Sequence, residues 1–167
     1  NRAADRLDSE RFLRSRLAAA GLDGSRVELL PKTIAFLDHL KAYNRLDISL
    51  DTFPYNGTTT VCESLLMGVP MVALRPSPAH DRHSARVALS LLTNAGYPKL
   101  VADDENEFVR IAADLAGNLE GLAGIRSRLR GDMAGSPVCD WPGFARRFEA
   151  ALRGMWKEAC AGAMARS

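Results

Sequence analysis

Apolar positions along the chain follow two alternating patterns, short continuous runs and longer stretches with a helical period. The run at residues 71–74 (MVAL) is apolar throughout, as in a strand that is covered on both faces. Elsewhere apolar residues return every three or four positions, as on one face of a helix. Strands are predicted at residues 26–30, 46–50, 71–74 and 100–101. Helices are predicted at residues 9–22, 33–45, 60–67, 83–94, 104–116, 119–130 and 144–161.

Strands that alternate with helices in this way are typical of a parallel sheet with helices on both faces. The predicted fold class is therefore α/β, a Rossmann-like doubly wound unit. Gly21, Gly68 and Gly96 follow apolar helical stretches and are predicted to end those helices. The loop-rich segment 131–142 (GDMAGSPVCDWP) is predicted to separate a sheet domain, residues 1–130, from a last amphipathic helix within 131–167.

The composition narrows the class of protein. The chain has 167 residues, 47% of them hydrophobic and 25% charged, as expected for one globular domain or one lobe of an enzyme. A net charge of +2 gives no electrostatic signal for nucleic-acid binding. The longest apolar run, residues 65–74, is too short to cross a bilayer, so no membrane partner is predicted. Three widely spaced cysteines match neither a zinc site nor a disulfide framework, which favours a cytoplasmic setting.

The stretch LDTFPYNGTTTVCESLLMGVP, residues 50–70, places Asn56, Gly57 and three threonines where a strand passes into a helix. In a doubly wound sheet, ligands bind at the carboxyl ends of the strands, where helix N-termini offer free N–H groups. Gly57 would let the backbone approach a ligand and adopt unusual angles. The hydroxyls of Thr58, Thr59 and Thr60 would add neutral donors. This combination suits a pyrophosphate.

The same residues also fit a purely structural role. Thr60 and Glu63 have the spacing of a capping box, in which the threonine caps the helix and the glutamate bonds back to its first turn. The two interpretations are compatible for the threonines. They compete for Glu63, which either closes the box or accepts bonds from ribose hydroxyls.

Histidines and arginines near the predicted sheet edge are further candidates. His39 lies on the preceding helix, where a lone histidine is more often a surface or core residue than a ligand. His80 and His83, with Arg82 and Arg86, form a basic cluster that is either a solvated loop or a contact to an anion. No metal-ligand spacing is present, so no metal site is predicted. The chain also lacks the G-x-G-x-x-G, P-loop and G-x-S-x-G motifs.

Taken together, several blocks resemble the C-terminal catalytic lobe of the O-linked N-acetylglucosamine transferases, glycosyltransferase family 41, and especially its SPINDLY-type and bacterial members. The central block is DISLDTFPYNGTTTVCESLLMGVPMV, residues 47–72. The further blocks are DHLKAY (38–43), SLLT (90–93) with Gly96, LVA (100–102) and MWKEACAG (155–162). The likeness spans most of the chain.

The resemblance implies the C-terminal half of a GT-B fold, which holds the nucleotide sugar UDP-N-acetylglucosamine as substrate, with no cofactor or metal. It implies an inverting transfer of the sugar to Ser or Thr of an acceptor protein. The implied roles are phosphate contact at the threonine turn, ribose contact at Glu63 and packing near the base at His39, with a less defined role for Arg86. The full set of donor-binding residues is His39, Asn56, Gly57, Thr58, Thr59, Thr60, Glu63 and Arg86. Thr58 departs from family members that carry histidine there.

The resemblance also implies parts that lie outside this region: an N-terminal lobe, a lysine that assists the leaving group, and TPR repeats that select acceptor proteins. No catalytic residue is therefore predicted in this lobe, and the chain alone is expected to catalyse poorly or not at all. The apolar side of the last helix would then lack part of its cover. Two alternatives remain open, a GDP-fucose-dependent transferase of the SPINDLY type and a nucleotide-binding module without catalysis.

Overall fold

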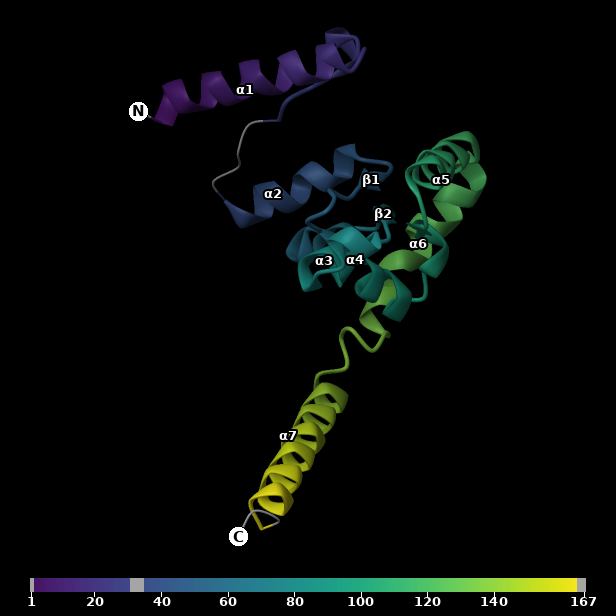
Figure 1. Ribbon diagram of the computed structural model, residues 1–167. Helices are drawn as coiled ribbons and strands as arrows, with labels where there is room; N and C mark the ends of the chain where they lie inside the picture. Colours follow the sequence, from purple (N-terminus) through teal and green to yellow (C-terminus); the bar gives the residue numbers. More distant parts are fainter. Residues whose placement is uncertain (1, 31–34, 165–167) are drawn as a thin grey trace. The chain divides into compact units, whose positions relative to one another are not determined.

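The computed structural model describes residues 2–30 and 35–164, and the chain forms two compact units, Asn1–His39 and Leu40–Ser167. Figure 1 shows the elements of both units in sequence colours. The boundary between the units falls inside the helix α2 (Phe36–Ala42), which is followed by the 3-10 turn η2 (Tyr43–Arg45). The predicted helix at 33–45 is thus confirmed from residue 36 onward, while residues 33 and 34 lie outside the described residues. The predicted division at residue 130 stays a prediction.

The first unit contains one long helix, α1 (Arg2–Ala19), which begins seven residues before its predicted start and ends just before Gly21, the predicted stop. Gly21 has φ +81°, a conformation that favours glycine, and its N–H bonds to the Ala18 carbonyl. The strand predicted at 26–30 is wrong. Asp23 caps a 3-10 turn, η1 (Gly24–Arg26), and the Val27 N–H returns to the Gly24 carbonyl. A strand needs a hydrogen-bonded neighbour, and the described residues of this segment form no ladder.

The second unit is built on a parallel sheet with the strand order β1-β2-β3. The strands are β1 (Ser49–Leu50), β2 (Met71–Leu74) and β3 (Val101–Ala102), with Ser49 opposite Met71 and Ala73 opposite Val101. The central strand β2 has the predicted bounds, and its residues 71–73 are buried. β1 is shorter than the predicted run at 46–50, and β3 is shifted by one residue from the predicted run at 100–101. The α/β class with parallel strands is confirmed.

Two crossover helices and a helical hairpin cover the sheet. The crossovers are α3 (Thr58–Leu66) and α4 (His83–Asn94), and the hairpin is α5 (Glu105–Gly117) with α6 (Leu119–Ala134). Helix α3 packs against α4 and α6, and α5 packs against β2 and β3. The core gathers the apolar faces of these elements, and its fully buried side chains include Val61, Leu65, Val72, Leu92 and Leu129. Gly68 and Gly96 have φ +74° and +90° and end α3 and α4 as predicted.

The predicted loop at 131–142 is shorter in the structure. Helix α6 continues to Ala134 because Met133 is buried in the core, which outweighs the glycine at 131. The last helix, α7 (Trp141–Met164), begins three residues before its predicted start. Its residues Phe144, Phe148, Leu152 and Trp156 form a stripe with exposed fractions of 48% to 71%. The described part of α7 therefore keeps the apolar stripe that the sequence predicts.

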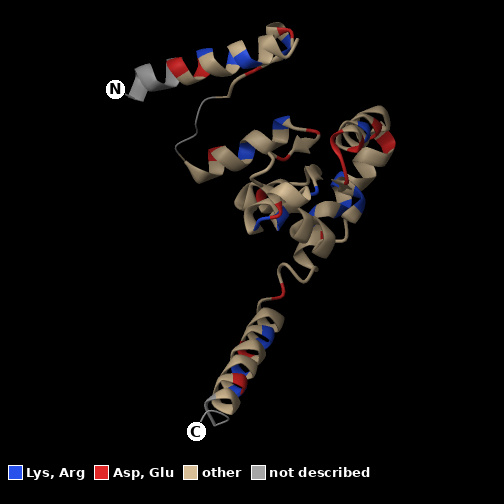
Figure 2. Ribbon diagram, in the orientation of Figure 1, with Lys and Arg blue, Asp and Glu red and all other residues tan. Residues whose placement is uncertain are grey.

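Charged residues of both signs are spread over the helices, and a run of acidic residues leads into α5 (Figure 2). No helix among the residues that the structure describes has the length and apolarity needed to cross a bilayer.

Candidate functional site

The candidate site is the turn between β1 and α3, at the carboxyl end of the parallel sheet. This is the edge at which doubly wound folds bind their ligands. Helix α3 begins at Thr58, two residues before its predicted start, and Gly57 is its N-cap residue. The Val61 N–H bonds to the Gly57 carbonyl at 2.9 Å. Within the described residues the backbone N–H groups of Thr58, Thr59 and Thr60 have no acceptor. The helix thus offers three unpaired donors and the positive end of its dipole.

The capping-box interpretation is wrong in this structure. Thr60 is the third residue of the helix, and no side chain caps the helix at Gly57. Glu63 instead accepts a hydrogen bond from the Tyr43 hydroxyl at 3.3 Å. Tyr43 is buried, and this burial, with the charge of Glu63 as the second cause, raises the pKa of Tyr43 to about 12. The phenol is a donor at neutral pH, and it bonds to the glutamate in the second turn of α3.

Asp51 sets the start of the helix, a role that the sequence pattern did not reveal. Its Oδ1 accepts the Gly57 N–H at 3.0 Å, and the residue is only 7% exposed. Burial raises the pKa of Asp51, and the Gly57 N–H partly offsets this effect. Its Oδ2 is buried without a hydrogen-bond partner in the described part of the chain. A carboxylate directly after the predicted strand at 46–50 was the available signal.

Asn56 fastens the turn to α4. Its side-chain Nδ2 donates to the Thr52 carbonyl at 3.1 Å, and its Oδ1 accepts the Ala88 N–H at 3.2 Å. Its own N–H bonds to the Ser84 carbonyl at 2.9 Å. Asn56 is 2% exposed, so its amide is engaged on both sides by protein groups. The geometry therefore gives Asn56 the part of a scaffold beside the turn.

Gly57 is required for a different reason than the sequence suggested. Its φ of −84° is ordinary for any residue, so the expectation of unusual backbone angles is wrong. A Cβ at this position would lie 2.9 Å from the Thr60 Cβ and 3.0 Å from its Oγ1. The glycine thus lets the threonine fold back over the helix start.

The other predicted site residues have local settings of their own. Arg86 lies in the first turn of α4, and its side chain, 54% exposed, forms an ion pair with Asp81 at 3.3 Å. His39 is an exposed residue of α2 and belongs to the first unit, and its role stays a prediction. His80 shares a hydrogen bond of 3.1 Å between its Nδ1 and the Ser77 hydroxyl, and His83 begins α4.

A cavity of about 510 Å³ opens beside the turn, at the carboxyl ends of β1, β2 and β3. We call it the strand-end cavity. Its apolar lining is Phe53, Pro54, Leu74, Pro76 and Ala85, and its polar lining is Asn56, Arg75, Ser77, His80, Asp103, Asp104 and Glu105. Because Asn56 lines it, the cavity adjoins the residue that precedes the start of the threonine turn. The sequence pattern did not reveal this cavity, since its lining comes from five separate segments.

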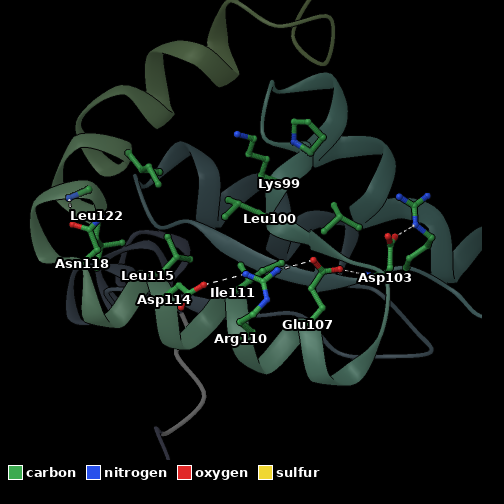
Figure 3. Close-up of a pocket in the computed structure, with 15 residues that line it drawn as sticks. Lys99, Leu100, Asp103, Glu107, Arg110, Ile111, Asp114, Leu115, Asn118 and Leu122 are labelled. Carbon is green, nitrogen blue, oxygen red and sulfur yellow. Dashed lines mark hydrogen bonds and ion pairs between the residues drawn. The ribbon is translucent and has the colours of Figure 1, made fainter.

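A second cavity, of about 580 Å³, lies along α5 and α6 (Figure 3). Apart from Lys99, the charged side chains that line it pair with one another. Arg110 bonds to Glu107 at 2.8 Å and to Asp114 at 3.1 Å along α5. These are exposed helix pairs, which are typical of a solvated helix face. The turn and the strand-end cavity therefore form the better candidate site. No group of three or more histidine, cysteine or acidic side chains suited to a metal occurs among residues 2–30 and 35–164.

Comparison with known proteins decides the family. The family profile described as glycosyl transferase family 41 matches residues 7–148. The chain belongs to glycosyl transferase family 41. This family 41 chain is 50% identical over 153 residues to a protein of Arabidopsis thaliana named "Probable UDP-N-acetylglucosamine--peptide N-acetylglucosaminyltransferase SPINDLY". The match covers 92% of the chain and 16% of that relative.

Two further relatives extend the comparison. A UDP-N-acetylglucosamine--peptide N-acetylglucosaminyltransferase of Caenorhabditis elegans is 32% identical over 148 residues, 89% of the chain and 12% of that protein. Among solved structures, a mutant of the Thermobaculum terrenum O-GlcNAc transferase superposes with a TM-score of 0.82 at 38% identity, over 94% of this chain and 29% of that one. The predicted family and the predicted fold, the C-terminal half of a GT-B enzyme, are confirmed.

Proposed function

We propose that this chain is the donor-binding lobe of an inverting protein O-glycosyltransferase that transfers N-acetylglucosamine from UDP-N-acetylglucosamine to Ser or Thr. The names of the relatives support this donor and a peptide acceptor. The chain spans only 16% of the SPINDLY relative's length, so catalysis is assigned to the whole enzyme. Three free cysteines, Cys62, Cys139 and Cys160, support the expected cytoplasmic setting.

The open start of α3 is the observation that carries the proposal. Three consecutive backbone N–H groups there have no acceptor among residues 2–30 and 35–164, and the exposed hydroxyls of Thr58 and Thr59 lie beside them. Asp51 accepts the Gly57 N–H and Asn56 accepts the Ala88 N–H of α4, so side-chain hydrogen bonds hold the turn at two points. Fixed amides at a helix N-terminus favour an anion, and a diphosphate is the anion of the proposed donor.

The proposed reaction develops negative charge at this turn. The acceptor hydroxyl oxygen forms a bond to the anomeric carbon, and the bond from that carbon to the diphosphate oxygen breaks. The bonding electrons leave with the nucleoside diphosphate, and the hydroxyl proton passes to a base outside this lobe. Donors that are already aimed at the diphosphate stabilise the charge without reorganising. The proposal assigns this neutralisation to the helix amides and threonine hydroxyls, and it includes no metal or cofactor.

The remaining residues take supporting roles in the proposal. Glu63, held by Tyr43, is placed to accept bonds from the ribose hydroxyls. His39 is assigned to packing near the uracil base of the nucleotide. Arg86 is assigned to the outer side of the diphosphate, once it exchanges its ion pair with Asp81 for the ligand. Asn56 and Gly57 shape the turn, and none of these residues acts on the reacting bond.

A titration of the chain with UDP and, separately, with GDP tests the donor. We expect UDP to shift the backbone amide NMR signals of residues 57–63. A preference for GDP would instead move the proposal to fucose transfer, and no shift with either nucleotide would contradict a donor site on this lobe.

The double variant Thr59→Ala with Thr60→Ala tests the turn itself. Because Thr60 does not cap the helix, no capping energy of about 1 kcal/mol is lost, and alanine favours a helix by up to about 0.7 kcal/mol per residue. We expect weaker UDP binding with unchanged or slightly raised stability. The matched control, Ser90→Ala with Thr93→Ala, removes two exposed hydroxyls from α4. A loss of stability without a loss of binding would sink the proposal.

A further inference from the structure

The strand-end cavity is built differently from the threonine turn that it adjoins. Leu74 and Pro76, at and just after the end of β2, belong to its apolar lining, which we call its floor, and Ala85 of α4 also lines it. Its volume of about 510 Å³ lies within the range of about 300–1,000 Å³ that is usual for ligand-binding pockets. A polar ligand alone would leave this apolar floor unused.

Exposed aromatic side chains connect the cavity to the turn. Phe53 lines the cavity, is 48% exposed, and meets Phe108 edge to face with ring centres 5.9 Å apart. Tyr55, two residues later and directly before Asn56, is 71% exposed. Apolar groups that remain exposed beside a site are typical of a surface that a partner covers. A polypeptide that occupies the cavity would contact Phe53, which lines it.

The rim of the cavity is acidic. Its lining includes one arginine and three carboxylates, which give a formal charge of −2 with histidine neutral: Arg75, Asp103, Asp104 and Glu105. Arg75 is already paired with Asp103 at 2.6 Å, and Asp104 accepts the Glu107 N–H as the cap of α5. Glu105 is exposed at the start of α5. Figure 2 shows this acidic segment leading into α5.

The two helix starts at this sheet edge therefore favour opposite charges. The start of α3 is open and carries neutral threonines, whereas α5 is capped by Asp104 and carries Glu105 and Glu107 in its first turn. A phosphate would be repelled at the second place, and a cation would be attracted to it. The diphosphate end of a donor thus belongs at α3, and the cavity suits a different part of the reacting complex.

We propose that the strand-end cavity docks the acceptor polypeptide, by taking an apolar side chain whose neighbour is a lysine or arginine facing Glu105. This inference rests on the proposed transfer to a polypeptide. The apolar side chain fills the floor beside Leu74, and the basic neighbour meets the acidic rim. The cavity thereby selects acceptor segments by the residues that flank the modified hydroxyl.

Three short peptides test the proposal on the 167-residue chain. They are the acetylated, amidated pentapeptides Gly-Ser-Gly-Leu-Arg, Gly-Ser-Gly-Leu-Glu and Gly-Ser-Gly-Asp-Arg, titrated with NMR detection at Phe53, Leu74 and Ala85. We expect the Leu-Arg peptide to bind best. Replacing its arginine should weaken binding about two- to fivefold, the scale of an exposed ion pair. Replacing its leucine should weaken binding about tenfold or more, because the apolar burial is lost.

Variants of the protein provide the matched test. Glu105→Gln should remove the preference for arginine over glutamate, whereas Glu120→Gln, an exposed acid at the start of α6, should leave it unchanged. Phe53→Ala should weaken binding of the Leu-Arg peptide. The control Leu119→Ala, at a residue of α6 that is 73% exposed, should leave this binding unchanged. An unchanged UDP response in each variant shows that the fold and the turn are intact.

Two outcomes would overturn the inference. One is equal binding of the three peptides, and the other is a response that spares Phe53, Leu74 and Ala85. Either result, with UDP still shifting residues 57–63, leaves the proposed donor site standing. A peptide response at the cavity with no UDP response at the turn would instead support docking and contradict the donor site.

Discussion

Gly57→Ala offers a direct test of how the turn is packed. The added Cβ would lie 2.9 Å from the Thr60 Cβ, well inside the separation of about 3.5–4.0 Å at which carbon atoms attract. Both Cβ atoms are fixed by the backbone, so a side-chain rotation cannot relieve the contact. The start of α3 must shift, and overpacking of this kind costs about 1–3 kcal/mol. Alanine recovers about 0.4–1 kcal/mol by restricting the unfolded chain.

The net expectation is a loss of about 1–2 kcal/mol in the free energy of unfolding, measured by urea denaturation. Gly131→Ala is the matched control, since the space around Gly131 in α6 is open. It should be stabilised by about 0.5–1 kcal/mol. UDP binding should fall in Gly57→Ala alone, because the shifted helix start carries the free N–H groups with it.

A second substitution separates the collision from other effects. Thr60→Gly removes both atoms that the new Cβ would meet, at a helix-propensity cost of about 0.3–0.5 kcal/mol. In the double variant, the Gly57→Ala penalty should largely disappear, so the two changes are strongly non-additive. If Gly57→Ala proves as stable as Gly131→Ala, or if its penalty persists beside Thr60→Gly, the packing argument is refuted.

Two further expectations concern the ionisable groups beneath the turn. Because the folded pKa of Asp51 is raised, its protonated form adds stability at pH values below the ordinary carboxyl pKa of 3.8, and this stability is lost as the pH rises through the raised value. Asp51→Asn should therefore become more stable relative to the parent as the pH rises through that window. Urea denaturation at several pH values from 3 to 8 measures this difference in the free energy of unfolding, and a difference that does not change with pH would contradict the expectation. Glu63→Gln should lower the pKa of Tyr43 from about 12 without restoring 10.0, because burial is the largest cause of the raised value. An ultraviolet titration of the phenol measures this pKa, and either an unchanged or a fully normal value would contradict the expectation.

Local signals in the sequence were enough for elements whose cause is local. Gly21, Gly68 and Gly96 end helices with positive φ, which glycine adopts readily, so their positions could be predicted. The strand β2 could be predicted because it is buried on both faces and reads as one apolar run. The family and the threonine turn followed from residues that are contiguous in the chain.

Elements that depend on distant partners could not be predicted. The start of α3 is set by Asp51, which bonds to Gly57 six residues later, so the capping rules placed it wrongly at Thr60. The segment at 26–30 has strand-forming residues, but whether a strand forms depends on a hydrogen-bonded neighbour that no local pattern reveals. The strand-end cavity combines the ends of three strands with the starts of α4 and α5.

Asn56 belongs at once to the turn and to the wall of the strand-end cavity. Through the Ser84 carbonyl and the Ala88 N–H it also joins both places to α4. A ligand that displaces or stiffens either place would therefore change the free energy of binding at the other. Such coupling is reciprocal, because each ligand must alter the other's affinity by the same factor. One buried amide would then set how strongly donor and acceptor change each other's affinity.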